Sequence, residues 1–227
     1  ELLCTSPEVH NPTGGHRGLE RRKELVAVCQ RVGIDILEDD CYRIGPALAS
    51  SYRALWPEHA WYISSISKTI TPSLRIGFAV APLGQMSDLR RAAEYGFFGL
   101  AWPLTEVARL VLADPKTLLI QQEMQKDVRR YIEVAVNTLG RYDLNWRGDV
   151  PFLWLNLPTG WRGSAFTRAA ERAGIQIRSA DEFALRDGRA PHAVRISING
   201  QIPIEAFEAA MQTLRSILEN PLEQISV

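Results

Sequence analysis

Lys68 is the residue with the clearest chemical potential in this 227-residue chain. Two hydroxyl residues, Ser65 and Ser67, precede it, and Arg75 follows seven positions later. A lysine amine condenses with an aldehyde, while hydroxyls and a planar guanidinium bind phosphate oxygens through charge-assisted hydrogen bonds. The segment therefore suits a ligand that carries both an aldehyde and a phosphate.

The tetrapeptide Ser65-Ile66-Ser67-Lys68 also fits the S-x-x-K pattern of β-lactamases, in which the serine is a nucleophile. The companion motifs S-D-N and K-T-G are absent from the sequence. We therefore reject the serine-nucleophile interpretation.

Two more segments place polar side chains where ligands bind. Asn11 lies in the turn-forming sequence Asn-Pro-Thr-Gly, whose turn role is compatible with a ligand contact. Glu38, Asp39 and Asp40 follow a short apolar strand expected over 34–37. In open α/β sheets the carboxyl ends of strands are where ligand-binding side chains collect.

Together these three segments resemble the signature blocks of the fold-type I pyridoxal-phosphate (PLP) aminotransferases of class I/II. In detail they are most similar to the aminotransferase-like domain of MocR-type (GntR family) transcriptional regulators, because the first block is followed by Arg21-Arg22 and Lys68 is followed by Pro72 and Arg75. The resemblance implies an α/β fold. It consists of the C-terminal part of a large PLP-binding domain, with a mainly parallel sheet flanked by helices, and a small α+β domain.

The resemblance also implies the catalytic roles. Lys68 would form the Schiff base with the cofactor and move a proton to and from the substrate. Asp39 would pair with the pyridine nitrogen, because it stands three residues before Tyr42 as in the family pattern. Glu38 and Asp40 compete for that role, and a plain acidic cluster at a strand end is the alternative.

The remaining contacts implied for the cofactor are hydrogen bonds and a phosphate clamp. Tyr42 and Asn11 would donate hydrogen bonds to the phenolic oxygen, although Tyr42 also suits a half-buried aromatic anchored by its hydroxyl. Arg75 would bind the phosphate with Ser65 and Ser67, and its alternative is a surface ion pair.

Arg195 and Asn11 are the expected substrate-binding residues. Arg195 interrupts the apolar strand Ala193–Ile198, where a charge is costly without a partner, and it resembles the arginine that binds the substrate carboxylate in the family. The alternative is an edge-strand arginine that faces water. Trp154 lies in an apolar strand and is interpreted as core, and Glu20–Lys23 as the solvated face of a helix.

The resemblance implies a partial large domain over 1–115, a connecting helix over 116–140 and a small domain over 141–227, and the periodicity of apolar residues predicts the elements within them. Helices are expected over 19–32, 85–95, 104–113, 117–139, 164–173 and 204–218. Strands are expected over 1–5, where a buried strand is predicted, and over 34–37, 61–64, 76–81, 152–157, 175–178 and 193–198.

Composition narrows the class of protein. The formal charge is zero and the hydrophobic share is 46%, which gives this segment no electrostatic reason to bind DNA or an anionic membrane. Three cysteines without a C-x-x-C pair and four scattered histidines suggest neither disulfides nor a metal site. We expect a cytoplasmic protein with no membrane span.

The family places a phosphate loop and a ring-stacking aromatic before the Asn-Pro-Thr-Gly block, and neither is found in this sequence. We therefore expect the C-terminal part of a longer protein, a homodimer when intact, and weak PLP binding by the chain alone. The predicted activity is PLP-dependent amino transfer between an amino acid and a 2-oxo acid.

The alternative is the effector-sensing domain of a MocR-type regulator, with DNA bound only through a missing N-terminal domain. A third possibility is another PLP reaction, such as decarboxylation or β-elimination.

Overall fold

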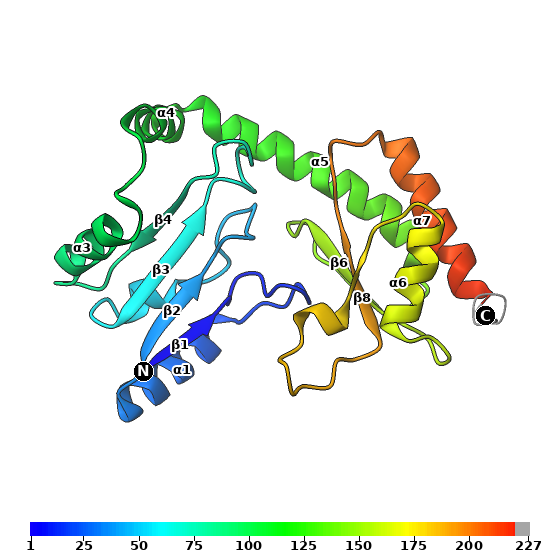
Figure 1. Cartoon of the computed structure of the whole chain (residues 1–227), viewed down its shortest axis with the longest axis horizontal. Helices are drawn as coiled ribbons and strands as arrows, with labels where there is room; N and C mark the ends of the chain where they lie inside the picture. The colour runs from blue at the N-terminus through cyan, green and yellow to red at the C-terminus, as the bar shows by residue number, and fades with distance from the viewer. Residues whose placement is uncertain (221–227) are drawn as a thin grey trace. The chain divides into compact units, whose positions relative to one another are not determined.

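The computed structural model describes residues 1–220, which form two compact units. Unit 1 contains Glu1–Asn11 and Gly15–Met124. Unit 2 contains Pro12–Gly14 and the described residues from Gln125 onward. Each unit has its own sheet (Figure 1). Each also has its own hydrophobic core.

Unit 1 is built on a four-stranded sheet in the order β1-β2-β3-β4 (Figure 1). The first three strands are parallel and β4 is antiparallel to β3. Parallel neighbours end at the same edge of a sheet, so the segments that follow β1, β2 and β3 meet there. The strands span Leu2–Thr5, Asp35–Asp39, Ala60–Ser65 and Gly77–Val80.

Helix α1 (Leu19–Val32) matches the helix predicted over 19–32. It ends where Gly33 adopts a left-handed conformation with φ 69°, which a glycine takes without steric cost. Val26 and Cys29 on its inner face pack with Ile36 of β2 in the core. The short helix α2 (Tyr52–Leu55), which the sequence did not predict, buries Tyr52 in the same core.

Three further helices follow the sheet of unit 1: α3 (Met86–Phe97), α4 (Trp102–Ala113) and α5 (Lys116–Leu139). Helix α5 begins in unit 1 and continues into unit 2. Among the helices described here, none is both long and apolar enough to cross a membrane.

The prediction that the first strand is buried is wrong. Residues of β1 alternate between exposed and intermediate, and 52% of Leu2 is accessible to solvent. In the part of the chain that the structure describes, β1 pairs only with β2 and lies at the edge of the sheet. An edge strand keeps one side open, which explains the exposure.

Unit 2 contains an antiparallel sheet in the order β5-β6-β8-β7. Its strands span Leu144–Asn145, Phe152–Asn156, Ala193–Ser197 and Arg178–Ser179, in that order across the sheet. The other elements are α6 (Gly163–Arg172), the 3-10 helix η1 (Ala180–Phe183) and α7 (Ile204–Glu219).

The two faces of this sheet differ in chemistry because successive strand residues point to opposite sides. Leu153 and Val194 belong to the large core that α5, α6 and α7 complete. Trp154 and Arg195 are direct cross-strand partners and lie on the opposite face. Trp154 is buried against Ala180, as expected of a core residue.

The strand predicted over 175–178 is wrong, because pairing with β8 begins only at Arg178. Helix α6 closes with Gly174 at φ 79°, and the backbone N–H of Ile175 donates to the carbonyl of Ala170 at 2.9 Å. This bond is the one that ends a Schellman motif. Ile175 is therefore held at the end of α6, and the chain joins the sheet ladder only at Arg178.

Candidate functional site

The predicted cofactor residues of unit 1 gather at the carboxyl edge of its parallel strands. Asn11 lies in the turn after β1, Asp39 ends β2, and Lys68 lies in the connection between β3 and β4. This edge is where α/β sheets bind ligands. The fold therefore brings three distant segments of the sequence to one edge of the sheet.

Lys68 has an accessible amine. The residue is exposed, and its Nζ lies 5.8 Å from the centroid of the Tyr42 ring. Among the described residues it forms no hydrogen bond or ion pair. An ammonium over an aromatic face is held weakly, by roughly 0.5–1 kcal/mol at exposed sites. The lysine is therefore available to a carbonyl ligand, and the Tyr42 ring lies beside it.

The two serines near Lys68 are ordered by their own hydrogen bonds. The Oγ of Ser65 lies 2.9 Å from the carbonyl oxygen of Ile76 and 3.0 Å from the Oγ of Ser67. The backbone N–H of Ser67 also donates to the Oγ of Ser65 at 3.1 Å. Since Ser65 pairs with Gly77 across the hairpin, the hydroxyls stand where β3 and β4 end and begin.

Arg75 lies in the same hairpin connection and has an unusual backbone. Its φ is 52°, a left-handed conformation that costs a side-chain-bearing residue roughly 1–2 kcal/mol. The residue is exposed, and in the described part of the chain it forms no ion pair. Strained backbone that persists without a local partner is found at ligand sites more than elsewhere.

Asp39 is separated from its two acidic neighbours by the pleat of β2. Glu38 and Asp40 are 0% and 5% exposed, whereas Asp39 is intermediate, and alternation places Asp39 on the other face. Its carboxylate accepts a hydrogen bond from the backbone N–H of Cys41 at 3.0 Å. Of the three acids, Asp39 is therefore the one on the less buried side.

On the opposite side, Asp40 accepts hydrogen bonds from Arg43 and Tyr62, and Glu38 belongs to a buried ionic network around Arg22 that the sequence did not reveal. Arg22 is 0% exposed, which corrects its interpretation as part of a solvated helix face. Its guanidinium donates to Glu8 at 2.5 Å and to the carbonyls of Arg17 at 2.8 Å and Ser50 at 3.0 Å, and lies 3.7 Å from Glu38.

One sequence signal could have indicated this burial. Arg22 precedes the core residues Val26 and Cys29 by four and seven positions, which places all three on one face of α1. Glu20, Arg21 and Lys23 are exposed, as predicted for that segment.

The pKa values of the two glutamates in this network shift in opposite directions. Burial raises the pKa of Glu38 to about 7, because the backbone N–H of Tyr52 and the nearby Arg22 compensate only in part. Burial acts on Glu8 in the same direction, but hydrogen bonds from the backbone N–H of Leu48 and from Arg22 outweigh it and leave the pKa below its ordinary value. Arg22 is therefore mainly the partner of Glu8.

Cys41 is placed next to Asp39 but is not a nucleophile. Burial raises the pKa of its thiol to about 12, and the nearby Asp39 and Asp40 carboxylates add to the effect. Because only the thiolate attacks, the side chain stays inert at neutral pH.

Arg195, the predicted carboxylate anchor, lies in unit 2 on the face opposite the large core. Its guanidinium carbon lies 5.4 Å from the ring centroid of Phe152 and 5.1 Å from that of Phe183. The guanidinium also donates to the Oγ of Ser197 at 3.1 Å. Strand β8 lies between β6 and β7, so Arg195 is not on an edge strand.

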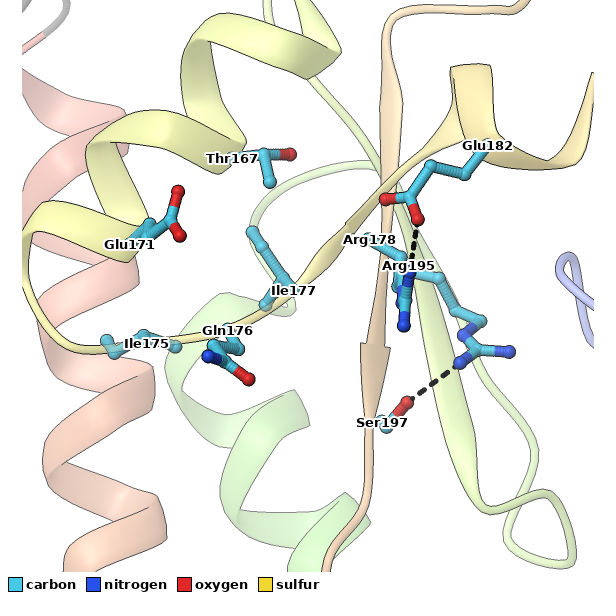
Figure 2. Close-up of a pocket in the computed structure, with 9 residues that line it drawn as sticks. All are labelled: Thr167, Glu171, Ile175, Gln176, Ile177, Arg178, Glu182, Arg195 and Ser197. Carbon is cyan, nitrogen blue, oxygen red and sulfur yellow. Dashed lines mark hydrogen bonds and ion pairs between the residues drawn. The ribbon is translucent and has the colours of Figure 1, made fainter.

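Arg195 lines a cavity of about 450 Å³, within the range of small-molecule sites (Figure 2). Polar and charged side chains dominate its wall. The lining residues are Thr167, Glu171, Ile175, Gln176, Ile177, Arg178, Glu182, Arg195 and Ser197.

Solved structures share the fold of this chain. The α-aminoadipate aminotransferase LysN of Thermus thermophilus superposes with a TM-score of 0.83 at 22% identity, over 99% of this chain and 60% of that one. The kynurenine aminotransferase of Pyrococcus horikoshii gives 0.85 at 19% identity, over 100% and 57%. The chain has the fold of the fold-type I aminotransferases.

The relatives found by sequence are named as transcriptional regulators, whereas the similar solved structures are aminotransferases. YdfD, an uncharacterized HTH-type transcriptional regulator of Bacillus subtilis (strain 168), is 34% identical over 82% of this chain and 41% of its own length. The HTH-type transcriptional regulator NorG of Staphylococcus aureus (strain N315) is 31% identical over 68% and 37%. No family model matches the sequence.

The chain thus spans less than half of the length of these regulators. The predicted resemblance is confirmed on both sides, since aminotransferases share the fold and HTH-type regulators share the sequence.

Proposed function

We propose that this aminotransferase-like domain binds PLP through Lys68 and acts on an amino compound, by moving an amino group between an amino acid and a 2-oxo acid. The accessible Lys68 amine beside Tyr42 carries the proposal. A lysine at the carboxyl edge of a parallel sheet, without an ion pair among the described residues, suits covalent attachment of an aldehyde.

The residues around Lys68 fit the other groups of the cofactor. The ordered Ser65 and Ser67 hydroxyls and the exposed Arg75 supply donors for a phosphate. The carboxylate of Asp39 suits a protonated ring nitrogen, and Asn11 and Tyr42 suit a phenolic oxygen. The cofactor residues that we assign are Asn11, Asp39, Tyr42, Ser65, Ser67, Lys68 and Arg75.

When bound, PLP supplies an electron sink for the negative charge that forms at Cα of an amino compound. In this proposal Lys68 would take the proton from Cα and deliver it to the carbon that was the aldehyde of the cofactor, and Asp39 would hold the proton on the ring nitrogen. Arg195 binds the carboxylate of the amino compound, and Asn11 also contacts it. The two rings beside Arg195 restrict its guanidinium before any ligand arrives.

Borohydride reduction of the full-length protein with PLP, followed by peptide mapping, tests the attachment. We expect the label on Lys68 and none in the Lys68→Ala variant, while the control Lys116→Ala keeps it. Label on Lys23, Lys116 or Lys126 would contradict the assignment.

Asp39→Asn tests the ring-nitrogen role. The variant should retain PLP, because the phosphate contacts are untouched, and should lose about a hundredfold or more in the rate of proton removal from Cα. Stopped-flow absorbance with a reacting amino acid measures that rate, and Asp88→Asn on exposed α3 is the control. An unchanged rate in Asp39→Asn would transfer the role to another acid.

A second candidate function is the sensing of an amino compound in a transcriptional regulator. The sequence relatives named HTH-type regulators favour it. In this candidate the domain binds PLP and the effector, and a segment outside this chain binds DNA. Multiple-turnover assays and DNA-binding titrations on the full-length protein separate the two functions. Effector-dependent DNA affinity without turnover would establish sensing.

A further inference from the structure

The wall of the unit 2 cavity contains a second arginine, Arg178, directly beside Arg195. The two residues are cross-strand partners in the β7–β8 ladder, so their side chains leave the sheet on the same face. Like charges placed directly opposite destabilise a sheet unless other groups compensate. The Glu182 carboxylate, which pairs with Arg178, offsets part of this repulsion.

The cavity exists because the chain does not join the sheet until Arg178. Residues 175–177 are held by the end of α6 and diverge from β8, as Figure 2 shows. The space between them and Ser197 is the cavity, and Thr167 and Glu171 of α6 form another part of its wall. Both arginines therefore reach a space large enough for a small molecule.

Each guanidinium is supported separately. Arg195 is flanked by Phe152 and Phe183, whereas Arg178 forms an ion pair with Glu182. Figure 2 shows the two guanidinium groups at separate positions rather than converging on one point. Two separated cations fit a ligand with two acidic groups better than a ligand with one.

The ion pair of Arg178 does not prevent this use. The side chains of Arg178 and Glu182 are 62% and 40% exposed. Exposed pairs of this kind contribute only about 0–1 kcal/mol, so a ligand carboxylate can join or replace Glu182. The backbone N–H of Ser179 also donates to Glu182 at 3.2 Å, which keeps the carboxylate near Arg178 when no ligand is bound.

We propose that this cavity binds a small dicarboxylate, in which Arg195 binds one carboxylate and Arg178 binds the other. The inference rests on the proposed function, because it takes Arg195 as the carboxylate anchor, and it deepens that function by naming the substrate class. The domain would then prefer acidic amino acids or their 2-oxo acids over neutral ones.

Calorimetric titration of the full-length, PLP-loaded protein tests the inference with three probes: glutarate, butyrate and inorganic phosphate. We expect glutarate to bind at least tenfold more tightly than butyrate. Arg178→Gln should remove that preference and leave butyrate binding unchanged. Arg178→Lys should keep part of it, because the charge remains but the fork is lost. Arg186→Gln, which changes an exposed arginine outside the cavity wall, should have no effect.

Arg195→Gln separates the carboxylate anchor from the second carboxylate site. It should weaken glutarate and butyrate alike. Equal affinity for glutarate and butyrate in the wild type, or an unchanged preference in Arg178→Gln, would overturn the dicarboxylate site and leave the anchor standing. Binding that does not depend on Arg195, or no binding of any probe, would overturn the anchor as well. Phosphate binding tighter than glutarate, lost in both variants, would replace the dicarboxylate with a phosphate ligand.

Discussion

Arg22 in unit 1 and Arg178 in unit 2 are both arginines beside a glutamate, but their surroundings are opposite. Arg22 is fully buried, and its guanidinium donates to Glu8 and to the carbonyls of Arg17 and Ser50. Arg178 is mostly exposed and lines a cavity. The first guanidinium is saturated with protein partners, whereas the second keeps donors for a ligand.

The difference shows how burial decides what an arginine does. A buried guanidinium that loses a partner, or is itself removed, leaves charges in a medium that cannot solvate them. An exposed guanidinium can exchange a protein carboxylate for a ligand carboxylate at little cost. We therefore expect substitutions in unit 1 to act on stability and substitutions in the unit 2 cavity to act on binding.

The largest effect is expected from Arg22→Met, which leaves Glu8 and Glu38 buried without their cation. We expect the free energy of unfolding to fall by about 3–5 kcal/mol. Urea denaturation measures it. Arg21→Met is the matched control, because Arg21 is adjacent on α1, is 70% exposed and pairs with Glu24; its effect should be at most about 1 kcal/mol. Similar losses in the two variants would contradict the distinction.

The next effect is a pH dependence that belongs to Glu38. Its pKa is raised from 4.5 to about 7 in the folded protein, so the folded state keeps a proton that the unfolded chain has lost. Stability should therefore fall as the pH rises through this window, by on the order of 3 kcal/mol from this group.

Glu38→Gln cannot ionise and should lose this dependence, so it should gain in stability relative to the wild type between pH 5 and 8. Denaturation series across that range compare the two proteins. Glu8 does not interfere, because its lowered pKa makes it titrate below 4.5. Parallel pH profiles for the two proteins would show that Glu38 is ionised throughout.

A smaller effect is expected at Arg75, where substitutions should change PLP affinity and the free energy of unfolding in different ways. Glycine adopts the observed φ of 52° without strain, so Arg75→Gly should leave the free energy of unfolding unchanged or raise it by about 1 kcal/mol. The same variant should bind PLP more weakly, because the phosphate loses a guanidinium. Arg75→Ala keeps the strain and should lose the same affinity. Undiminished PLP affinity in both variants would exclude Arg75 from the phosphate site.

The smallest effect on stability is expected in the unit 2 cavity. Arg178→Gln should change the free energy of unfolding by at most about 0.5 kcal/mol, because it removes only an exposed ion pair. Thermal unfolding without ligand measures this. A loss near that of Arg22→Met would mean that Arg178 is structural, and the comparison of the two arginines would fail.

The sequence by itself determined the features that depend on local signals. The boundaries of α1 follow from its apolar spacing and from Gly33, both of which lie within the helix or next to it. The motifs that contain Asn11, Asp39 and Lys68 indicated the fold through their resemblance to a known family, and the parallel strands bring these segments to one edge of the sheet.

Only the tertiary structure decided which charged side chains are buried and which partners they have. Arg22 and Arg21 look alike in the sequence, and Arg22 is buried because Glu8 and Ser50, from distant segments, supply partners for its donors. Arg178 stands beside Arg195 because the register of β7 and β8 pairs the two residues, while the closing bonds of α6 hold the chain before β7 away from the sheet. Burial of a charge depends on partners brought from elsewhere in the chain, and no local pattern encodes them.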